Sequence, residues 1–469
     1  MRLIYILLLY PLLTFGQSTS YVEQNISLEL DAGWNMFGYS CYDPMDLVEA
    51  FSPVVDKVII VKNNDGKAYM PEFSFNGIGN LELHQGYQIK LTEAITDFQF
   101  CPFLVPLMEG CLDSLACNLK PEANMADGSC EYPELGYDCD GNLLDNLFEL
   151  PDLAFRTYLI ENYPEVMEYD FLNIDAALVP DTFFIYSESI ENLDGLQNFS
   201  NLRNLFIAGN DALTSTPDLS GLSNLEELHI ISNYALTSIP ELSGLNNLEH
   251  LSISDNDALT SIPDLSGLNN LEHLSISNND ALTSIPDLSG LNNLSELNIY
   301  YNDVLTSIPD LSGLWYLSEL NIYDNDVLTS IPDLSGLNSL SQLSISRNDV
   351  LTSIPDLDLP GSGLYNLNIL DIDGNDVLTS IPDLFGLNLK WLTIEDNDAL
   401  TSIPQLSVPS YLEILKIKDN DALTSIPDLS SLSLSNLTYL SISGNDSLKC
   451  VIGYPSQLTI QESWPPICD

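Results

Sequence analysis

The feature that most constrains the fold of this chain is a repeat of about 23 residues that fills its second half. Asparagines mark the units, and their spacing is 23 residues six times, then 27, 22, 23 and 25. The markers are Asn210, Asn233, Asn256, Asn279, Asn302, Asn325, Asn348, Asn375, Asn397, Asn420 and Asn445. A period of this length indicates supersecondary units that stack on one another, because a single unit cannot bury its own apolar face.

Each unit begins with a short strand. Around Leu251 and Ile253 apolar and polar residues alternate, which is the period of a β-strand. Leu251 and Ile253 therefore point to one face, and His250, Ser252 and Ser254 point to the other. Stacking of neighbouring units then joins the apolar faces into one continuous core.

The rest of the unit returns the chain to the start of the next strand. The marker asparagine is expected to turn the chain inward and to bond backbone groups that the turn leaves unpaired. The segment Ile262-Pro263-Asp264-Leu265 then runs back, and its proline excludes a helix interior or a central strand. We expect an extended return arm or a short 3₁₀ turn.

The stretch Leu248 to Asn256 reads L-x-x-L-x-I-x-x-N and resembles the core motif of the leucine-rich repeat family, with isoleucine at the third leucine. The resemblance covers about residues 190–449. It implies a mostly β, α/β-type solenoid that is right-handed and curved, with a parallel sheet on the concave face and an irregular or 3₁₀ convex side. The extra stretch Leu359-Pro360-Gly361-Ser362 is expected to bulge as a loop.

The first residues indicate export. Arg2 precedes an apolar run from Leu3 to Leu13, and Gly16 offers a small residue for cleavage, the pattern of a secretory signal peptide. No later stretch approaches the roughly 18 consecutive apolar residues that would suggest a transmembrane segment. We expect a secreted or cell-surface, extracellular protein.

Smaller modules flank the repeats. Short alternating runs separated by glycine-bearing turns predict a small all-β domain; Gly33 to Gly38 and Gly86 to Gln88 resemble a module of secreted bacterial proteins. Residues 110–130 resemble Cys- and Asp-rich linker repeats and, loosely, thrombospondin type 3 calcium repeats.

Asp152 is the expected N-cap of a helix. This helix resembles the cap that opens secreted bacterial leucine-rich repeat proteins. The predicted order is signal peptide (1–16), β module (17–102), linker module (103–146), helical cap (147–198), repeats (199–449) and C-terminal cap (450–469).

The eight cysteines lie outside the repeats and predict disulfides, as is common where small exported modules lack a large core. We expect a Cys41–Cys101 bond in the β module. Cys450 and Cys468 bracket a tail that resembles a disulfide-closed cap. The remaining four can pair among themselves in three ways; they are Cys111, Cys117, Cys130 and Cys139. A zinc site has less support, since no Cys-x-x-Cys occurs.

The charge balance limits the partners. There are 13 Lys+Arg against 68 Asp+Glu, a net charge of −55, which repels nucleic-acid backbones and anionic membranes. Cations are favoured, above all Ca²⁺, whose ligands are oxygens. Asp113, Asn118 and Asp127 are the candidate calcium ligands. Aspartates also follow most marker asparagines and most repeat prolines, where they form turns, bridge Ca²⁺ or attract diffuse counter-ions.

No catalytic or nucleotide-binding motif occurs, so we expect no enzyme and no cofactor, with the possible exception of Ca²⁺. Three of the four histidines, His229, His250 and His273, fall in consecutive units. They suggest either a Zn²⁺ or Cu²⁺ site or simple duplication of the unit.

The concave face carries the functional hypothesis. Residues at equivalent positions of neighbouring strands are expected to lie about 4.8 Å apart. Tyr300, Tyr301 and Tyr323 then form what we expect to be the only dense aromatic group on this face, with Tyr300 and Tyr323 pointing to solvent. The polar residues around it are Glu296, Asn298, Glu319 and Asn321. This mixture suits a protein or glycan ligand bound by a monomer. The alternative is a structural, Ca²⁺-responsive spacer in an extracellular matrix.

Overall fold

The computed structural model describes residues 21–24, 27–101, 103–187, 189–357, 364–384, 386–404, 406, 411–429, 436–453 and 465–468. The chain divides into two compact units, one up to Asn142 and one from Leu143 onward. The expected signal peptide at 1–16 and the inserted loop at 359–362 lie outside the described residues. Within those residues, no helix has the length and apolar character needed to cross a membrane.

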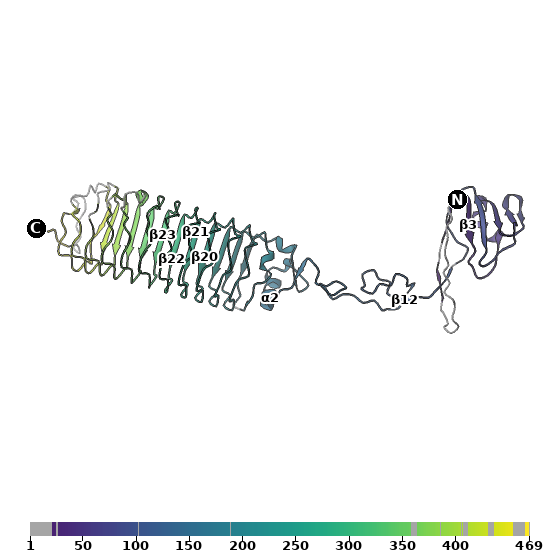
Figure 1. The fold of residues 1–469 in the computed structure, drawn as a ribbon, viewed down its shortest axis with the longest axis horizontal. Helices are drawn as coiled ribbons and strands as arrows, with labels where there is room; N and C mark the ends of the chain where they lie inside the picture. The colour runs from purple at the N-terminus through teal and green to yellow at the C-terminus, as the bar shows by residue number, and fades with distance from the viewer. Residues whose placement is uncertain are drawn as a thin grey trace. The chain divides into compact units, whose positions relative to one another are not determined.

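The first unit contains the small β domain (Figure 1). Its main sheet has the order β3-β9-β5-β6-β7, and its inward side chains, such as Phe37, Val61 and Ile89, are buried. A disulfide joins Cys41 to Cys101, the pairing expected from the sequence. The strands are β1 (Tyr21–Gln24), β2 (Leu28–Leu30), β3 (Gly33–Gly38), β4 (Met45–Asp46), β5 (Val58–Asn63), β6 (Ala68–Met70), β7 (Phe75–Asn76), β8 (Asn80–Leu81), β9 (Gly86–Leu91), β10 (Ile95–Phe98) and β11 (Phe103–Pro106). The helices are α1 (Leu47–Ala50), η1 (Ser52–Lys57) and η2 (Pro71–Phe73).

The β domain extends past the boundary expected at residue 102. Strand β11 pairs antiparallel with β1, from Tyr21 opposite Pro106 to Gln24 opposite Phe103. The linker module is expected to begin at residue 103, so the expected boundary cuts off these four residues. The pairing of two segments about 80 residues apart cannot be read from either segment alone.

The linker module holds its shape through two disulfides, Cys111–Cys130 and Cys117–Cys139. This is one of the three pairings that the sequence left open. The remaining regular structure is one short parallel pair, β12 (Glu109–Gly110) with β13 (Met125–Ala126).

The second unit opens with the predicted helical cap. Helix α2 (Leu153–Asn162) buries Phe155 and Leu159, and the Asp152 carboxylate caps it by accepting the Phe155 N–H at 2.9 Å. The helix ends before Pro164, which begins η3 (Pro164–Val166). The other elements of the cap are β14 (Leu147–Phe148), β15 (Met167–Glu168), β16 (Phe171–Asn173), η4 (Ala176–Leu178) and η5 (Leu196–Asn198).

The cap also contains a strand that was not predicted. Strand β17 (Thr182–Ile185) pairs in parallel with the first repeat strand and opens the large sheet, so residues 182–185 belong structurally to the array. Phe183 and Ile185 are buried, as the equivalent Leu and Ile of a repeat are. The strand escaped prediction because no marker asparagine follows it.

The array is a 12-stranded parallel sheet in which each strand pairs with the next in sequence (Figure 1). After β17 the strands are β18 (Asn204–Ala208), β19 (Glu227–Ile231), β20 (His250–Ser254), β21 (His273–Ser277), β22 (Glu296–Tyr300), β23 (Glu319–Tyr323), β24 (Gln342–Ser346), β25 (Ile369–Asp373), β26 (Trp391–Glu395), β27 (Ile414–Lys418) and β28 (Tyr439–Ser441). The inward Leu and Ile of every strand are buried in one continuous core. The fold is thus the mostly β, leucine-rich solenoid that the sequence predicts.

The marker asparagines form a buried ladder. Asn302, for example, is fully buried; its Nδ2 donates to the carbonyls of Ile276 at 3.1 Å and Tyr300 at 3.0 Å. The Oδ1 of Asn325 in the next unit accepts both the backbone N–H and the Nδ2 of Asn302, each at 3.3 Å. Each asparagine therefore satisfies backbone groups of its own turn and links it to its neighbours.

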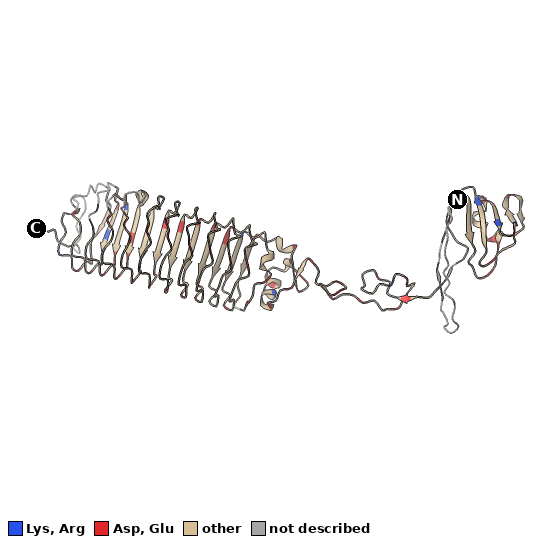
Figure 2. Cartoon of the chain, viewed as in Figure 1, with Lys and Arg blue, Asp and Glu red and all other residues tan. Residues whose placement is uncertain are grey.

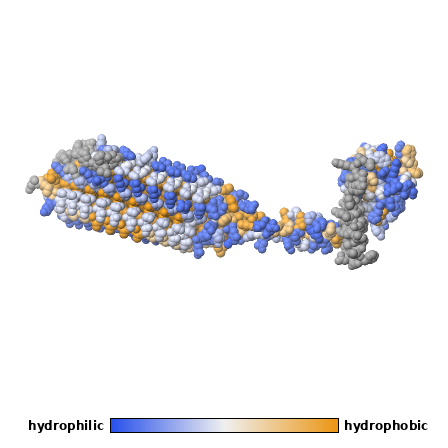
Figure 3. Space-filling view, viewed as in Figure 1, coloured by the Kyte–Doolittle hydropathy of each residue, from blue (hydrophilic) through white to orange (hydrophobic). Residues whose placement is uncertain are grey.

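The return arms are irregular, with isolated parallel bridges such as Ser215 to Ser238 and one 3₁₀ helix among the described residues, η6 (Leu364–Asn366). Equivalent residues therefore line up in rows, and Figure 3 shows hydrophobic and hydrophilic rows running side by side along the array. At the end of the array, Cys450 is bonded to Cys468, again as expected. Val451 is buried against the last unit, so this cap covers the core.

Candidate binding face

The candidate site lies on the solvent side of the 12-stranded sheet, which we call the outer sheet face. It is formed by the first, third and fifth residues of each strand, because the second and fourth point into the core. The register pairs equivalent residues of neighbouring strands, such as Glu296 with Glu319, Asn298 with Asn321 and Tyr300 with Tyr323. Side chains 23 residues apart in sequence are thus direct neighbours.

The predicted tyrosines come together as one group, which we call the tyrosine patch: Tyr300, Tyr301 and Tyr323. The rings of Tyr300 and Tyr323 stack with centroids 4.5 Å apart and an interplanar angle of 2°. Tyr301 meets both edge-on, at 5.9 and 5.4 Å. Tyr300 and Tyr323 are only partly exposed, contrary to the expectation that both point freely to solvent, because each ring covers a face of the other. Tyr301 is the most exposed of the three, at 41%.

Tyr301 occupies an unusual backbone position. Its φ is +55°, in the left-handed region that bulky side chains disfavour. The same turn position in the other units also has positive φ. It is filled there by Gly209, Ser232, Asp255, Asn278, Asp324, Arg347, Gly374, Asp396, Asp419 and Gly444. A tyrosine at this position therefore adopts a backbone conformation that its side chain disfavours.

A hydrogen-bonded network lies beside the tyrosine patch. The Nδ2 of Asn298 donates to Glu296 at 2.7 Å, and the Nδ2 of Asn321 donates to Asn298 at 2.7 Å and to Glu319 at 2.8 Å. His273 adds a contact of 2.9 Å between its Nδ1 and Glu296. The Asn298 bond, assisted by His273, lowers the pKa of Glu296, so this carboxylate stays ionised. All four predicted polar residues therefore belong to one network.

Asp324 borders the patch on its other side. Burial raises its pKa, while the neighbouring Arg347 opposes that shift. The Arg347 guanidinium stands 4.0 Å from its Oδ2, and that buried oxygen accepts no hydrogen bond from the described residues. The tyrosine patch is thus bounded by carboxylates on two sides.

The three histidines do not form a metal site. His250 stacks on His273 at 4.4 Å, while His229 stacks on Phe206 at 4.5 Å. Burial lowers the pKa of His229, which favours the neutral ring. Over the residues that the structure describes, no group of three His, Cys, Asp or Glu side chains is arranged to hold a metal ion.

A second aromatic group stands on the same face, so the expectation that the tyrosine patch is the only one is wrong. Phe184 of β17 stacks on Phe206 at 4.5 Å, and Phe206 stacks in turn on His229. Phe184 and the nearby Tyr186 are 54% and 62% exposed. The prediction missed this group because residues 182–185 were expected to belong to the helical cap. Phe184 was therefore not aligned with Phe206 on the neighbouring strand.

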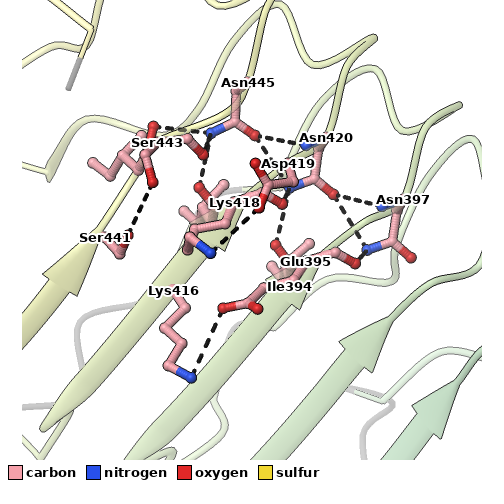
Figure 4. Close-up of polar contacts among 12 residues, drawn as sticks. Ile394, Glu395, Asn397, Lys416, Lys418, Asp419, Asn420, Ser441, Ser443 and Asn445 are labelled. Carbon is pink, nitrogen blue, oxygen red and sulfur yellow. Dashed lines mark hydrogen bonds and ion pairs between the residues drawn. The ribbon is translucent and has the colours of Figure 1, made fainter. Parts of the chain in front are cut away.

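Sequence reasoning also missed a group of charged residues near the C-terminal end of the face. Asp371 and Asp373 of β25 lie beside Glu395 of β26, and burial together with these two neighbours raises the pKa of Asp371 to about 6. Lys416 of β27 lies 3.8 Å from Glu395, and Lys418 lies 3.3 Å from Asp419 (Figure 4). Figure 2 places the strand lysines of the array at this end. Equivalent positions on these three strands are 22 and 23 residues apart, so the cluster is not visible as a local pattern in the sequence.

The aspartates that follow the repeat prolines have a local role. The carboxylates of Asp264, Asp287, Asp310 and Asp333 each accept the N–H of the serine two residues on, at 2.9 to 3.0 Å. This is the turn chemistry that the sequence predicts. The aspartates after the marker asparagines behave differently: burial, and then repulsion from Asp280 and Asp326, raises the pKa of Asp303.

The three candidate calcium ligands also occupy turns. Asp113 accepts the Leu115 N–H and the Tyr132 hydroxyl, and Asp127 accepts the Ser129 N–H. The Asn118 amide bonds the backbone of residues 129 and 131. The Leu115 N–H and the Tyr132 hydroxyl lower the pKa of Asp113, and the side chain and N–H of Ser129 lower the pKa of Asp127. Calcium binding here stays a prediction.

Comparison with known proteins finds a family model that matches part of the array. Residues 186–256 match the model of the R13L1/DRL21 leucine-rich repeats. No curated protein matches the chain. Among solved structures, YopM of Yersinia pestis, a leucine-rich effector, is 26% identical over 55% of this chain and 70% of its own, with a TM-score of 0.40. The internalin InlF of Listeria monocytogenes is 20% identical over 62% of this chain and 95% of its own, with a TM-score of 0.36.

A plant protein is similar too. The Arabidopsis receptor kinase HAESA is 23% identical over 56% of this chain and 46% of its own, with a TM-score of 0.41. These overall similarities are low, and the fold assignment depends instead on the repeat motif, the parallel register and the match at residues 186–256. Together these three observations support the assignment of the array as a stack of leucine-rich repeats.

Proposed function

We propose that this chain is a non-catalytic, extracellular recognition protein that binds a protein or glycan on its outer sheet face. Leucine-rich repeat solenoids typically serve as protein-binding domains, and their extended sheets provide the binding surface. The observation that most supports the proposal is the tyrosine patch, held on neighbouring strands beside a hydrogen-bonded polar network.

The structure of the patch favours binding over a passive surface role. Tyrosine combines a large apolar ring with a polar tip, which is the profile of an interface anchor. The stack on rigid strands means that little side-chain freedom is lost when a partner docks. The left-handed Tyr301 is a further local cost that core packing does not explain, since its side chain is 41% exposed.

Export is proposed on separate grounds. All eight cysteines are paired in four disulfides, and such bonds persist in oxidising surroundings. The sequence of residues 1–16 reads as a signal peptide.

The test is capture of ligands by the full chain on protein and glycan arrays, followed by the double variant Tyr300→Ala, Tyr323→Ala. We expect binding to be lost and the melting midpoint to fall only slightly, because both rings are partly exposed. The control is Tyr234→Ala, which removes an exposed tyrosine from the unit of β19 and should leave binding intact.

Retention of full capture by the double variant would favour the second candidate, a Ca²⁺-responsive spacer. One observation favours that alternative: aspartates recur along the array, and burial, followed by repulsion from neighbouring aspartates, raises the pKa of Asp303 and Asp376. Cations that bind between them would stiffen the array.

A further inference from the structure

One of the two units that carry the tyrosine patch, the unit of β23, also departs from the repeat pattern at the opposite end of its strand. In the turn leading into a strand, most units place an asparagine whose Nδ2 donates to a carbonyl of the preceding unit. Asn247, Asn270 and Asn293 do so at 2.8 to 2.9 Å, and Asn366 and Asn388 at 2.8 to 3.0 Å. Even Ser339 makes the equivalent bond, from its hydroxyl to the Trp315 carbonyl at 2.8 Å.

The turn between β22 and β23 departs from this pattern, as does the turn before β27, where Tyr411 takes the same position. Tyr316 takes the place of the bonding asparagine, and the described structure gives it no equivalent bond. Trp315, which precedes it, takes the place of another asparagine. Both side chains are 63% exposed, so core packing does not account for either of them. A polar ladder is interrupted here by two exposed aromatic rings.

The two departures lie at opposite ends of the neighbouring strands β22 and β23, and we call the surface between them the strip. Tyr301, whose backbone is left-handed, lies at one end of the strip. The exposed Trp315–Tyr316 pair lies at the other end. Tyr323 follows Tyr316 by seven residues, which is about 23 Å if the chain is extended. Between the ends lie the carboxylates and amides of Glu296, Asn298, Glu319 and Asn321. Residues that depart from the repeat pattern and do not pack into the core tend to occur at functional sites.

The chemistry of the strip distinguishes between classes of ligand. A protein interface buries an apolar centre, but the centre of this strip is charged and polar, and covering it with apolar groups would leave it unsatisfied. Sugar hydroxyls can donate to these carboxylates, while the C–H faces of sugar rings pack on aromatic rings. An anionic sugar is disfavoured, because β22 and β23 contain no basic residue and Glu296 stays ionised.

Resting on the proposed function, we infer that the ligand of this face is an uncharged polysaccharide chain. It lies along strands β22 and β23, from the tyrosine patch to Trp315 and Tyr316. The aromatic groups at the two ends pack against its sugar rings. Between them, the Glu carboxylates accept hydrogen bonds from its hydroxyls, and the Asn amides donate hydrogen bonds to them.

The experiment compares binding of the full chain to neutral polysaccharides, a β-glucan and a mannan, with binding to polygalacturonate and dextran sulfate. The key variant is Trp315→Asn, Tyr316→Asn, which restores the residues of neighbouring units. We expect at least a tenfold loss of affinity for the neutral polymer that binds. The melting midpoint should be equal or higher, because an asparagine in place of Tyr316 can regain the ladder bond. A matched control is Tyr365→Asn, an equally exposed aromatic two units on, which should leave affinity unchanged.

The outcomes separate the two proposals. If Tyr300→Ala, Tyr323→Ala abolishes binding but the Trp315, Tyr316 variant does not, the proposed function stands and the strip is wrong. The inference also fails if the face captures only proteins or acidic polymers, or if Tyr365→Asn weakens binding equally, which would mean that the ligand crosses the strands. Neutral-polymer binding that neither double variant changes contradicts both.

Discussion

At the scale of single residues, the outer sheet face sets the charge of its carboxylates by position. Glu296 accepts hydrogen bonds and its pKa is lowered, whereas burial, together with Asp373 and Glu395, raises the pKa of Asp371 to about 6. Lys416 opposes this shift only in part. Two acidic residues on one sheet thus differ because their burial and their neighbours differ.

The Asp371 environment predicts a pH-dependent stability. Because its folded pKa lies above the ordinary value of 3.8, its contribution is fully present below about pH 4 and is lost as the pH rises through about 6. Asp371→Asn should therefore raise the free energy of unfolding of the array at pH 7.5 by about 1–2 kcal/mol, after allowance for solvent screening. At pH 4 the variant should match the wild type. Urea unfolding at both pH values checks this, and an equal gain at pH 4 would contradict it.

At the scale of the element, one repeat consists of a strand, an asparagine turn and a return arm. In the turn, the asparagine side chain forms hydrogen bonds with buried backbone groups. The strand alone buries only two side chains, such as Leu297 and Ile299. The asparagine connects three consecutive units through its amide. Stability of the array is therefore a property of neighbouring units rather than of one unit.

Truncation of one ladder residue tests this view. In Asn302→Ala, the carbonyls of Ile276 and Tyr300 and the side chain of Asn325 each lose a partner in a buried turn. Since an unsatisfied buried group costs about 1–3 kcal/mol, we expect a loss of about 3 kcal/mol or more. Hydrogen exchange should accelerate in the two adjoining units first. Asp303→Ala, at the next, exposed position, is the control and should change stability by about 0.5 kcal/mol or less.

At the scale of the whole molecule, charge is the dominant feature. The net charge of −55 is distributed over two units with separate cores, one between Leu30 and Phe98 and one between Leu150 and Val451. The aspartate rows concentrate negative potential along the array. The repulsion that opposes compaction is therefore sensitive to the cations in the medium.

The calcium hypothesis gives a prediction at this scale. Millimolar Ca²⁺ should raise the melting midpoint more than Mg²⁺ at the same ionic strength, because Mg²⁺ gives up its water reluctantly. The double variant Asp113→Asn, Asp127→Asn should lose part of the difference. Thermal melts of both proteins in both ions decide it: equal midpoints in the two ions, together with an unchanged variant, would exclude a specific site in the linker module.

Much of this architecture could be predicted from the sequence because it is local and repeated. The alternation around Leu251 and Ile253 sets the strand faces, and the spacing of asparagines sets the unit length and the buried ladder. Asp152 marks the start of α2 because capping depends on a few adjacent residues. The pairing of Cys41 with Cys101 follows from their position in one small module.

Only the tertiary structure decided which outward residues meet and in what state. The stack of Phe184 on Phe206, the half-burial of Tyr300 and Tyr323 and the raised pKa of Asp371 all depend on side chains from neighbouring strands. The choice of Cys111–Cys130 among three pairings likewise depends on the path of the linker. The physical reason is that parallel stacking in register turns sequence separations of 22 to 27 residues into direct contacts, whose packing and electrostatics no single unit contains.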